Sequence, residues 1–441
     1  MCDVLNLEWT SSPSRDRQVA TLVCNYLRYC GLNIVEGSIF NSYYLLKKHN
    51  PKVLFLTNST GAINNFETVK YAWSKGISVI SLVSEGNFTD DKGEFFLWGW
   101  NKDKILYETV QCHWSDRARK IALRAYPELN GRLMVSGSVG ADLYRIKPKI
   151  KKNVFLNKYK KNYSKVIGVG CWDFGVYYEK DPRFPTFKSR YSQDTINRFK
   201  NDGKKFNKIL ESIISANKNI LFLIKEHPGV RLGRISSAIQ GLEYYDNTIF
   251  LKNEESIADC IAISDLWVVY ESTSAMEAWL YGIPTAMLNP SGPDFPRSEI
   301  HRGNICLRDE QMFQTLIDNL YNSRNLKEVD RSVEKAREEI IRSIIQWDDG
   351  LNHVRAGNII IKIINNNRNV SSPKISYFEK EFVKQFVKWN VLQFLGRIKT
   401  TNRRFNFKEM NTLATERMEQ QLLFYTTIGF SKEELLTINV I

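Results

Sequence analysis

Short runs of apolar, β-branched residues alternate with amphipathic helical patterns along the first third of the chain. The runs predict strands, and several stretches between them predict helices. The predicted strands are 4–9, 33–36, 53–57, 77–83 and 132–135, and the predicted helices are 15–30 and 66–75. This alternation is typical of a parallel sheet covered by helices. We therefore predict an α/β domain over residues 1–150.

A second alternating series follows a Lys-rich segment, 151–165, which has no sustained period and is predicted to be a linker. Its predicted strands are 166–170, 219–225, 249–251, 266–270 and 285–288, and its predicted helices are 192–216, 274–281 and 326–347. This series predicts a second α/β domain over residues 166–350. Two domains also fit the length of 441 residues, because single cores rarely grow past roughly 250 residues.

The C-terminal segment has a different pattern. An Asn-rich stretch, 365–373, predicts a hinge before a helical appendage over 374–441. The segment 374–408 contains nine Lys and Arg but two Glu. Four aromatic residues recur in it at helical spacing: Phe378, Phe382, Phe386 and Trp389. One interpretation is that 374–408 binds an anionic membrane surface. The alternative is that these aromatic side chains pack on the second domain.

Charge and cysteine content narrow the class of protein. The net charge of +14 predicts acidic partners, but without zinc-finger spacing, an RNP-like aromatic string or a single basic helix we do not expect nucleic acid. The seven cysteines are scattered and form no C-x-x-C pair, which favours a reducing cytoplasm over a disulfide framework or a zinc site. The N-terminus lacks a signal-peptide pattern, and no apolar run approaches the roughly 18 residues of a spanning helix. We expect a cytoplasmic protein, soluble or peripheral on the inner face of the plasma membrane.

The strongest local signal is the segment 220–229 (ILFLIKEHPG), in which an apolar strand pattern stops at a polar turn. Ligands bind at the carboxyl ends of strands in open α/β sheets, so His227 is a candidate phosphate-binding and catalytic residue. Pro228 restricts the turn that orients it, and Lys225 and Arg231 add positive charge. The alternative is a structural histidine at a strand end.

A second signal is the segment 264–284 (SDLWVVYESTSAMEAWLYGIP), which predicts a strand, a hydroxyl-rich turn and a helix. Ser272, Thr273 and Ser274 stand at the strand-to-helix corner, where helix N–H groups and hydroxyls suit a phosphate. The alternative is simple N-capping, with Glu277 completing a capping box.

Together these motifs resemble GT-B glycosyltransferases, and more narrowly bacterial capsule and lipopolysaccharide enzymes that include Kdo- and sialic-acid-type transferases. The resemblance rests on K-x-H-P followed by S-T-S-x-x-x-E-A-x-x-x-G-x-P. It implies two Rossmann-like domains facing a central cleft, with the acceptor on the first domain and the nucleotide sugar on the second. It also implies that His227 and the hydroxyls of 272–274 hold the nucleotide phosphate, often of CMP, and that Glu277 holds the ribose.

In the first domain, the strand pattern 77–83 ends in Ser84-Glu85-Gly86, where the similar enzymes have two carboxylates and a glycine. Glu85 is therefore the expected general base and Gly86 an expected cleft residue, although Ser84 replaces the first carboxylate. The alternative is a solvated turn glutamate. Asp90 and Asp91 are the reserve candidates for the base.

Two Gly-rich segments complete the expected cleft. Ser138, in VSGSVGADLY, is a candidate cleft residue, with a tight structural turn as the alternative. In GVGCWDFG, Gly170 would let the nucleotide approach the backbone and Trp172 would stack on a base or sugar, again with turn chemistry as the alternative. No D-x-D motif stands at a convincing strand end, so we expect neither a metal nor a cofactor besides the donor.

The sequence thus predicts an inverting, metal-independent glycosyltransferase. Its expected partners are a nucleotide sugar, with a CMP-linked acidic sugar favoured, and a surface-polysaccharide or lipid-linked acceptor. Three alternatives stay open: a glycerol- or ribitol-phosphate transferase of teichoic-acid type, a sugar-nucleotide epimerase, and a non-catalytic membrane scaffold.

Overall fold

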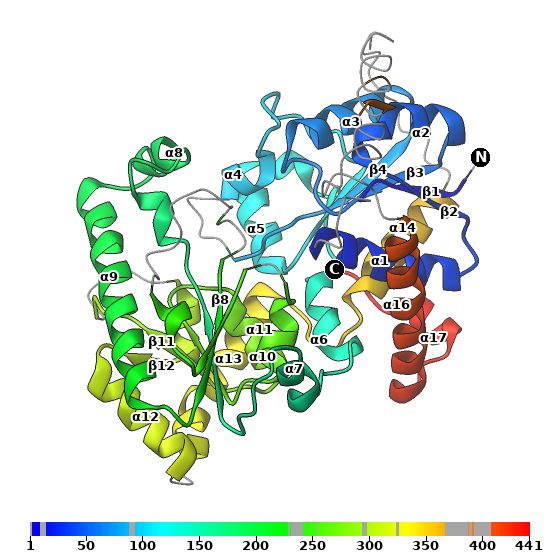
Figure 1. Ribbon diagram of the computed structural model, residues 1–441. Coiled ribbons are helices and arrows are strands. Elements are labelled where there is room, and N and C mark those ends of the chain that lie inside the picture. The colour runs from blue at the N-terminus through cyan, green and yellow to red at the C-terminus, as the bar shows by residue number, and fades with distance from the viewer. Residues whose placement is uncertain are drawn as a thin grey trace. The chain divides into compact units, whose positions relative to one another are not determined.

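The computed structural model divides the chain into two compact units, shown in Figure 1. Unit 1 comprises Met1–Lys147 and Arg342–Ile441, and unit 2 comprises Pro148–Ile341. The structure describes residues 2–8, 15–87, 93–227, 230, 241–252, 254–292, 298–322, 326–366, 387, 390–391 and 407–441.

Unit 1 contains a six-stranded parallel sheet with the order β2-β1-β3-β4-β5-β6. Its strands are β1 (Val4–Asn6), β2 (Ile34–Glu36), β3 (Val53–Leu56), β4 (Ser78–Leu82), β5 (Val110–His113) and β6 (Leu133–Val135). β1 and β3 to β5 are buried throughout, as expected for strands of a parallel sheet with helices on its faces.

Unit 2 contains a second six-stranded parallel sheet with the order β12-β11-β10-β7-β8-β9. Its strands are β7 (Val166–Gly170), β8 (Leu221–Lys225), β9 (Thr248–Leu251), β10 (Leu266–Val269), β11 (Thr285–Leu288) and β12 (Ile305–Leu307). The predicted fold class is therefore confirmed for both sheets.

The helices of unit 1 include α1 (Arg15–Tyr29), α2 (Ser42–His49), α3 (Ile63–Ser74), α4 (Gly93–Trp98), α5 (Asp116–Ala125), α6 (Leu143–Ile146), α14 (Asn352–Asn365), α16 (Phe407–Ile428) and α17 (Lys432–Leu436). Those of unit 2 include α7 (Lys152–Lys158), α8 (Phe184–Lys188), α9 (Gln193–Ala216), α10 (Ile257–Ala262), α11 (Ser274–Leu280) and α12 (Glu310–Asn322). The helix α13 (Leu326–Ile344) crosses from unit 2 into unit 1.

Helix α9 illustrates how the sequence pattern produces an element. Ser192 is its N-cap, and the Ser192 hydroxyl accepts a hydrogen bond from the backbone N–H of Thr195. Buried apolar side chains then recur at three- and four-residue spacing, at Ile196, Phe199, Phe206, Leu210 and Ile213. One face of the helix therefore packs on the core of unit 2.

The predicted boundaries between the domains need correction. Within the predicted linker, 151–165, residues 152–158 form α7, whose Phe155 and Leu156 side chains are buried. The Lys-rich composition hid these two core positions. The predicted second domain also extended to residue 350, whereas unit 2 ends at Ile341 and the chain then returns to unit 1.

Helix α14 covers the hydrophobic face of α1 in unit 1. Ala356, Ile359 and Ile360 belong to the same buried cluster as the apolar face of α1. Gly357 allows a close approach, because a Cβ atom there would lie 2.3 Å from Cδ1 of Tyr26. Figure 1 shows α14 and α16 alongside α1.

The C-terminal helices belong to unit 1. The Asn25 amide donates to the backbone oxygen of Ala414 at 2.9 Å, and the Gln421 amide donates to that of Leu22 at 3.0 Å. His353 is fully buried, with Nδ1 2.8 Å from Oδ2 of Asp142 and Nε2 2.6 Å from the Tyr425 hydroxyl. The predicted C-terminal helical region is thus present, and α16 packs on α1 as part of unit 1.

The predicted basic, aromatic segment 374–408 lies almost entirely outside the described residues. Phe378, Phe382, Phe386 and Trp389 are among the residues that the structure does not describe. None of the helices in the described part of the chain is long and apolar enough to cross a membrane.

Candidate functional site

The sheet topology of unit 2 creates a position where ligands bind in open α/β sheets. β7 lies between β10 and β8, so the chain runs outward on one side of β7 and later returns on the other. The strand order reverses between β7 and β10, and ligands of open α/β sheets bind at the carboxyl ends of the strands at such a point. Gly170, the last residue of β7, is in register with Lys225 of β8 and Val269 of β10. The segments after these three strands therefore meet at one edge.

Two aromatic rings of the predicted site come together at this edge. The rings of Trp172 and His227 lie 6.4 Å apart between centroids, and Trp172 lies 6.0 Å from Tyr270. The His227 side chain is 38% exposed, so a ligand can reach it. Trp172 is half-buried beside it. The structure thus groups two of the residues that the sequence singled out.

An acidic and basic cluster beside His227 was not anticipated from the sequence. Nδ1 of His227 lies 3.8 Å from Oδ2 of Asp173, and the same oxygen accepts a hydrogen bond from Nη1 of Arg183 at 2.6 Å. Asp181 accepts two hydrogen bonds from the Arg183 guanidinium, at 2.9 and 2.7 Å, and one from the Arg183 backbone N–H at 2.8 Å. Asp173 directly follows the singled-out Trp172, but no spacing rule connects it with Arg183.

The charge state of His227 follows from these neighbours. Desolvation by burial lowers the pKa of His227, the Asp173 carboxylate acts to raise it, and the Arg183 guanidinium acts to lower it. The net shift is downward from the ordinary value of about 6.5. The imidazole is therefore mostly neutral near neutral pH in the free protein.

The three hydroxyl residues at the corner between β10 and α11 differ in burial and in hydrogen bonding. The Ser272 hydroxyl is half-buried and accepts a hydrogen bond from the backbone N–H of Ser274 at 3.2 Å. The Ser274 hydroxyl is buried and accepts a hydrogen bond from Nε1 of Trp267 at 3.1 Å. Thr273 is the N-cap residue, without a side-chain capping bond. The capping box that was the alternative interpretation is therefore absent here.

This geometry assigns Ser274 a structural contact that the sequence did not predict. Its hydroxyl fixes the indole of Trp267 against β7, whereas Ser272 and Thr273 remain half-buried at the corner. Helix α11 has only seven residues, and the backbone N–H groups of Ala275 and Met276 donate to the oxygens of Ser272 and Thr273. A phosphate at this corner would therefore depend more on the hydroxyls than on free helix N–H groups.

The glycines of β7 make room for the Trp267 side chain of the neighbouring strand β10. A Cβ atom at Gly168 would lie 2.3 Å from Cε3 of Trp267, and one at Gly170 would lie 3.0 Å from Oγ of Ser274. These glycines let the β10–α11 corner close onto β7. The structure shows this packing role for Gly170, and the approach of the nucleotide to its backbone stays a prediction.

Of the other residues predicted to contact the nucleotide, the structure describes Lys225 and Glu277. The buried Lys225 ammonium donates to the backbone oxygen of Lys252. Glu277 is half-buried in the first turn of α11. Pro228 and Arg231 lie outside the described residues. The binding roles assigned to these residues stay predictions.

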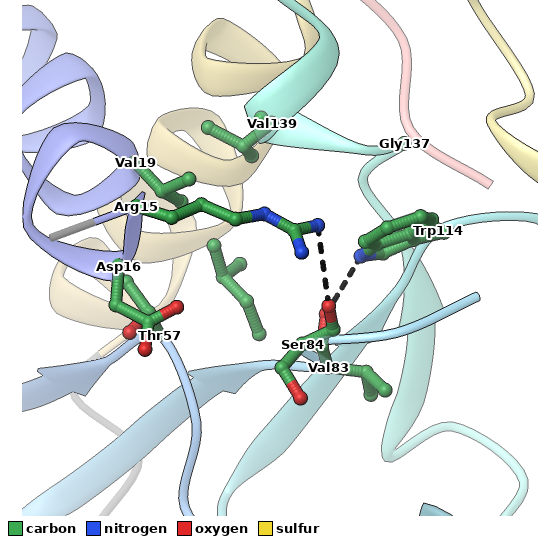
Figure 2. Close-up of a pocket in the computed structure, with 11 residues that line it drawn as sticks. Arg15, Asp16, Val19, Thr57, Val83, Ser84, Trp114, Gly137 and Val139 are labelled. Atoms are coloured by element: carbon green, nitrogen blue, oxygen red, sulfur yellow. Dashed lines mark hydrogen bonds between the residues drawn. The ribbon is translucent and has the colours of Figure 1, made fainter. Parts of the chain in front are cut away.

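Unit 1 contains a pocket at the corresponding edge of its own sheet (Figure 2). β1 lies between β2 and β3, so the strand order reverses between β1 and β3. The backbone N–H of Thr57, just after β3, donates to Oε1 of Glu8, just after β1, at 2.8 Å. The pocket is lined by Arg15, Asp16, Val19, Thr57, Leu82, Val83, Ser84, Trp114, Gly137, Val139 and Gly140.

Arg15 connects this pocket with the predicted general base. As Figure 2 shows, Arg15 extends across the pocket toward Ser84, and its Nη2 donates to the Ser84 backbone oxygen at 3.5 Å. Nη1 of Arg15 lies 3.4 Å from Oε1 of Glu85, and the guanidinium stands 5.5 Å from the Trp114 ring centroid. Desolvation raises the pKa of Glu85, and Arg15 partly offsets this effect. A raised pKa makes a carboxylate a stronger base, and the role of Glu85 as the general base stays a prediction.

The remaining predicted residues of unit 1 frame this pocket indirectly. A Cβ atom at Gly86 would lie 2.5 Å from Cε3 of Trp114, so Gly86 allows the indole to pack against the chain. Ser138 is buried, and its backbone oxygen accepts a hydrogen bond from the Asn352 amide at 3.1 Å. Ser138 does not line the pocket, although its neighbours Gly137 and Val139 do. Asp90 and Asp91 lie outside the described residues.

Sequence reasoning missed three of the polar or aromatic lining residues, namely Arg15, Asp16 and Trp114. Desolvation raises the pKa of Asp16, with Arg15 opposing the shift. Arg15 and Asp16 stand at the start of a helix, and Trp114 follows a short strand. None of the three belongs to a sequence motif that would have indicated a site. In the part of the chain that the structure describes, no group of three His, Cys, Asp or Glu side chains is arranged to hold a metal ion.

Comparison with known proteins identifies the fold. No protein-family model matches the sequence, and no curated protein matches it. Solved structures do match. A putative UDP-N-acetylglucosamine 2-epimerase from Listeria monocytogenes has a TM-score of 0.55 at 12% identity, covering 86% of this chain and 100% of that chain.

Two further structures have a similar fold at similarly low identity. MnaA of S. aureus, in a co-structure with UDP, has a TM-score of 0.51 at 12% identity and covers 86% of this chain and 100% of that chain. The wall teichoic acid polymerase TagF, in a structure with CDPG, has a TM-score of 0.51 at 10% identity and covers 82% of this chain and 89% of that chain. The chain therefore has a GT-B-type fold, and the resemblance found in the sequence is confirmed at the level of the fold.

Proposed function

We propose that this protein is a glycosyltransferase that uses a nucleotide-activated sugar. One observation carries the proposal: Trp172 and His227 lie together after β7 and β8, next to β10, the strand that the Ser272–Thr273 corner follows, where the strand order of the unit 2 sheet reverses. An aromatic ring, an imidazole and two hydroxyls are groups that suit a base or sugar next to a phosphate. Likeness to solved structures supports the fold on which this proposal is built.

In the proposed reaction, an acceptor hydroxyl attacks the anomeric carbon of the donor. Its proton passes to Glu85, while the bond between the anomeric carbon and the phosphate oxygen breaks. Attack from the face opposite the departing nucleotide inverts the anomeric configuration. His227 and the hydroxyls of Ser272 and Thr273 stabilise the charge on the leaving phosphate.

The finer assignments extend this proposal. The resemblance of the sequence motifs to Kdo- and sialic-acid-type transferases favours a CMP-linked acidic sugar as donor. It also favours a surface-polysaccharide or lipid-linked acceptor, and the basic composition of 374–408 favours an enzyme that works at the inner face of a membrane. A teichoic-acid-type phosphate transferase is a variant in which a polyol phosphate replaces the sugar.

A sugar-nucleotide epimerase is the second candidate function. Asp16 and Arg15 line the unit 1 pocket, Glu85 pairs with Arg15, and desolvation raises the pKa of both carboxyl groups. Two such carboxyl groups suit the removal of a proton from a sugar carbon and its return. Such an enzyme would interconvert two sugar nucleotides without any acceptor.

The first experiment is a thermal-shift panel of CMP, CDP, UDP, UDP-N-acetylglucosamine and GDP. The proteins are the wild type, His227→Gln, and the matched control His301→Gln in the same unit. A ligand at a hundred times its Kd stabilises its protein by about 2.7 kcal/mol. We expect one nucleotide class to stabilise the wild type and the control fully, and His227→Gln much less. If no nucleotide stabilises the protein, the proposal fails and the scaffold interpretation gains support.

Product analysis then separates the candidates. A glycosyltransferase forms a new glycosidic bond only when an acceptor is present, with release of the nucleotide. An epimerase converts the sugar nucleotide without acceptor and incorporates deuterium from D₂O into the sugar carbon. Deuterium incorporation without acceptor would therefore replace the leading proposal with the second one.

A further inference from the structure

His227 stands at the end of a fixed chain of charged side chains. Both carboxylate oxygens of Asp181, whose side chain is fully buried, accept hydrogen bonds from Arg183. The third donor of Arg183, Nη1, lies 2.6 Å from Oδ2 of Asp173. The same oxygen lies 3.8 Å from Nδ1 of His227. Asp173 is therefore held in place by Arg183 and cannot easily turn away from the imidazole.

A neutral imidazole is poorly matched to this position when a phosphate arrives. It carries a single N–H, so it can donate to Asp173 through Nδ1 or to a phosphate through Nε2, but not to both. An imidazolium carries both N–H groups and a positive charge. Two anionic groups on opposite sides of the ring, one permanent and one brought by the ligand, favour that form.

We propose that the protein takes up a proton on His227 when a nucleotide binds, with Asp173 as the positioning residue that accepts the Nδ1–H bond while Nε2–H donates to the phosphate. This inference rests on the proposed nucleotide site of unit 2. The proton comes from solvent, and no covalent bond forms or breaks in this step. The 3.8 Å separation between His227 and Asp173 shortens to a hydrogen bond in the complex.

Other charged side chains also lie at this edge of the sheet. Lys225 and Glu226 belong to the same strand end as His227, and the buried Lys225 ammonium is bound to a backbone oxygen. Desolvation raises the pKa of Glu226, with the nearby Lys252 opposing the shift. Glu271 follows β10 and is half-buried. Among the charged groups that act on His227, Asp173 favours the imidazolium and Arg183 opposes it.

The sign of the pH dependence follows directly. In the free protein the pKa of His227 lies below its ordinary value, whereas a bound phosphate raises it. Between these two pKa values, binding takes up a proton, and affinity falls as pH rises, by at most about tenfold per pH unit. Below the lower value and above the upper one, affinity becomes independent of this group.

Isothermal titration calorimetry at pH 7 measures the proton uptake. The probe is UDP-N-acetylglucosamine, whose esterified phosphates do not titrate near neutral pH, or CMP if the panel selects cytidine nucleotides. Titrations in PIPES, HEPES and imidazole buffers give the number of protons as the slope of observed enthalpy against buffer ionisation enthalpy. For CMP, the value for His227→Gln is subtracted to remove the titration of the phosphate itself.

We expect the wild type to take up between about one half and one proton, and His227→Gln to take up none beyond the ligand's own. Asp173→Asn should lower the uptake by at least half and flatten the decline of affinity between pH 6 and 8. Glu179→Gln is the matched control: this acidic residue is in the same segment, pairs with Lys200 and is 68% exposed. It should behave as the wild type.

The outcomes separate this inference from the proposal beneath it. Tight binding with equal proton uptake in the wild type and His227→Gln would overturn the inference and leave the nucleotide site intact. Absence of binding would overturn the nucleotide site itself. If Asp173→Asn does not fold, the pH dependence of wild-type affinity decides alone, because a flat profile from pH 5 to 8 contradicts the proton uptake.

Discussion

The buried contact between Ser274 and Trp267 separates a structural role of the hydroxyl-rich corner from a binding role. Trp267 is fully buried, and the Ser274 hydroxyl accepts the hydrogen bond of its indole N–H at 3.1 Å. Ser274→Ala leaves that buried donor without its partner, which costs about 1–3 kcal/mol. A domain of about 150–250 residues loses about 2–4 °C in melting temperature per kcal/mol. We therefore expect a loss of several degrees.

Ser272→Ala is the matched comparison, because the Ser272 hydroxyl is half-buried and water can replace part of its hydrogen bond. The assay is differential scanning calorimetry of both variants, with and without the nucleotide that the panel selects. Ser274→Ala should lower the melting temperature and keep the nucleotide-induced shift, whereas Ser272→Ala should mainly reduce that shift. The reverse pattern, an unchanged melting temperature with no nucleotide response in Ser274→Ala, would refute this reasoning.

Three other predictions concern both units. His113 is buried, and burial lowers its pKa to about 4, so between pH 6.5 and 4 only the unfolded chain binds its proton. The free energy of unfolding should therefore fall by about 3 kcal/mol over that range in the wild type but not in His113→Gln, as measured by urea denaturation at each pH. Gly168→Ala should cost about 1–3 kcal/mol or more, because the new Cβ overlaps the buried Trp267 ring; an unchanged melting temperature would contradict this packing. Glu85→Gln should lower kcat by about 10²–10⁴ without unfolding the protein, and full activity of this variant in a transfer assay would exclude Glu85 as the base.

The sequence was most informative where a buried strand stops at polar or glycine residues. β7 was predicted as Val166–Gly170, the range that the structure shows, and β8, β10 and β11 were predicted within two residues at each end. These strands are continuous apolar runs, because both faces of a parallel sheet are covered. β5 was missed because Gln111 and His113 interrupt its apolar pattern, and β12 was missed as well.

The candidate site could be predicted only as far as local motifs reached. His227 and Trp172 follow recognisable strands, so their meeting at one edge was foreseeable from the predicted fold. The contact between Asp173 and Arg183 was not, because it depends on how the loop after β7 folds back on itself. The burial of the Ser274 hydroxyl was equally hidden, since the residues around it look the same in sequence whether they bind a phosphate or an indole.

The interrupted course of unit 1 has a consequence for how the protein is made. Residues 1–147 form its sheet and the apolar face of α1, but α14, which covers that face, comes from residues 352–365. During synthesis at about 5–20 residues per second, that face waits at least ten seconds for its cover. Unit 2, by contrast, is one continuous stretch and is complete once Ile341 has emerged. Unit 1 therefore starts to be synthesised first but completes its fold last. Until α14 is made, the uncovered apolar face of α1 is where chaperones would bind the nascent protein and where misassembly would begin.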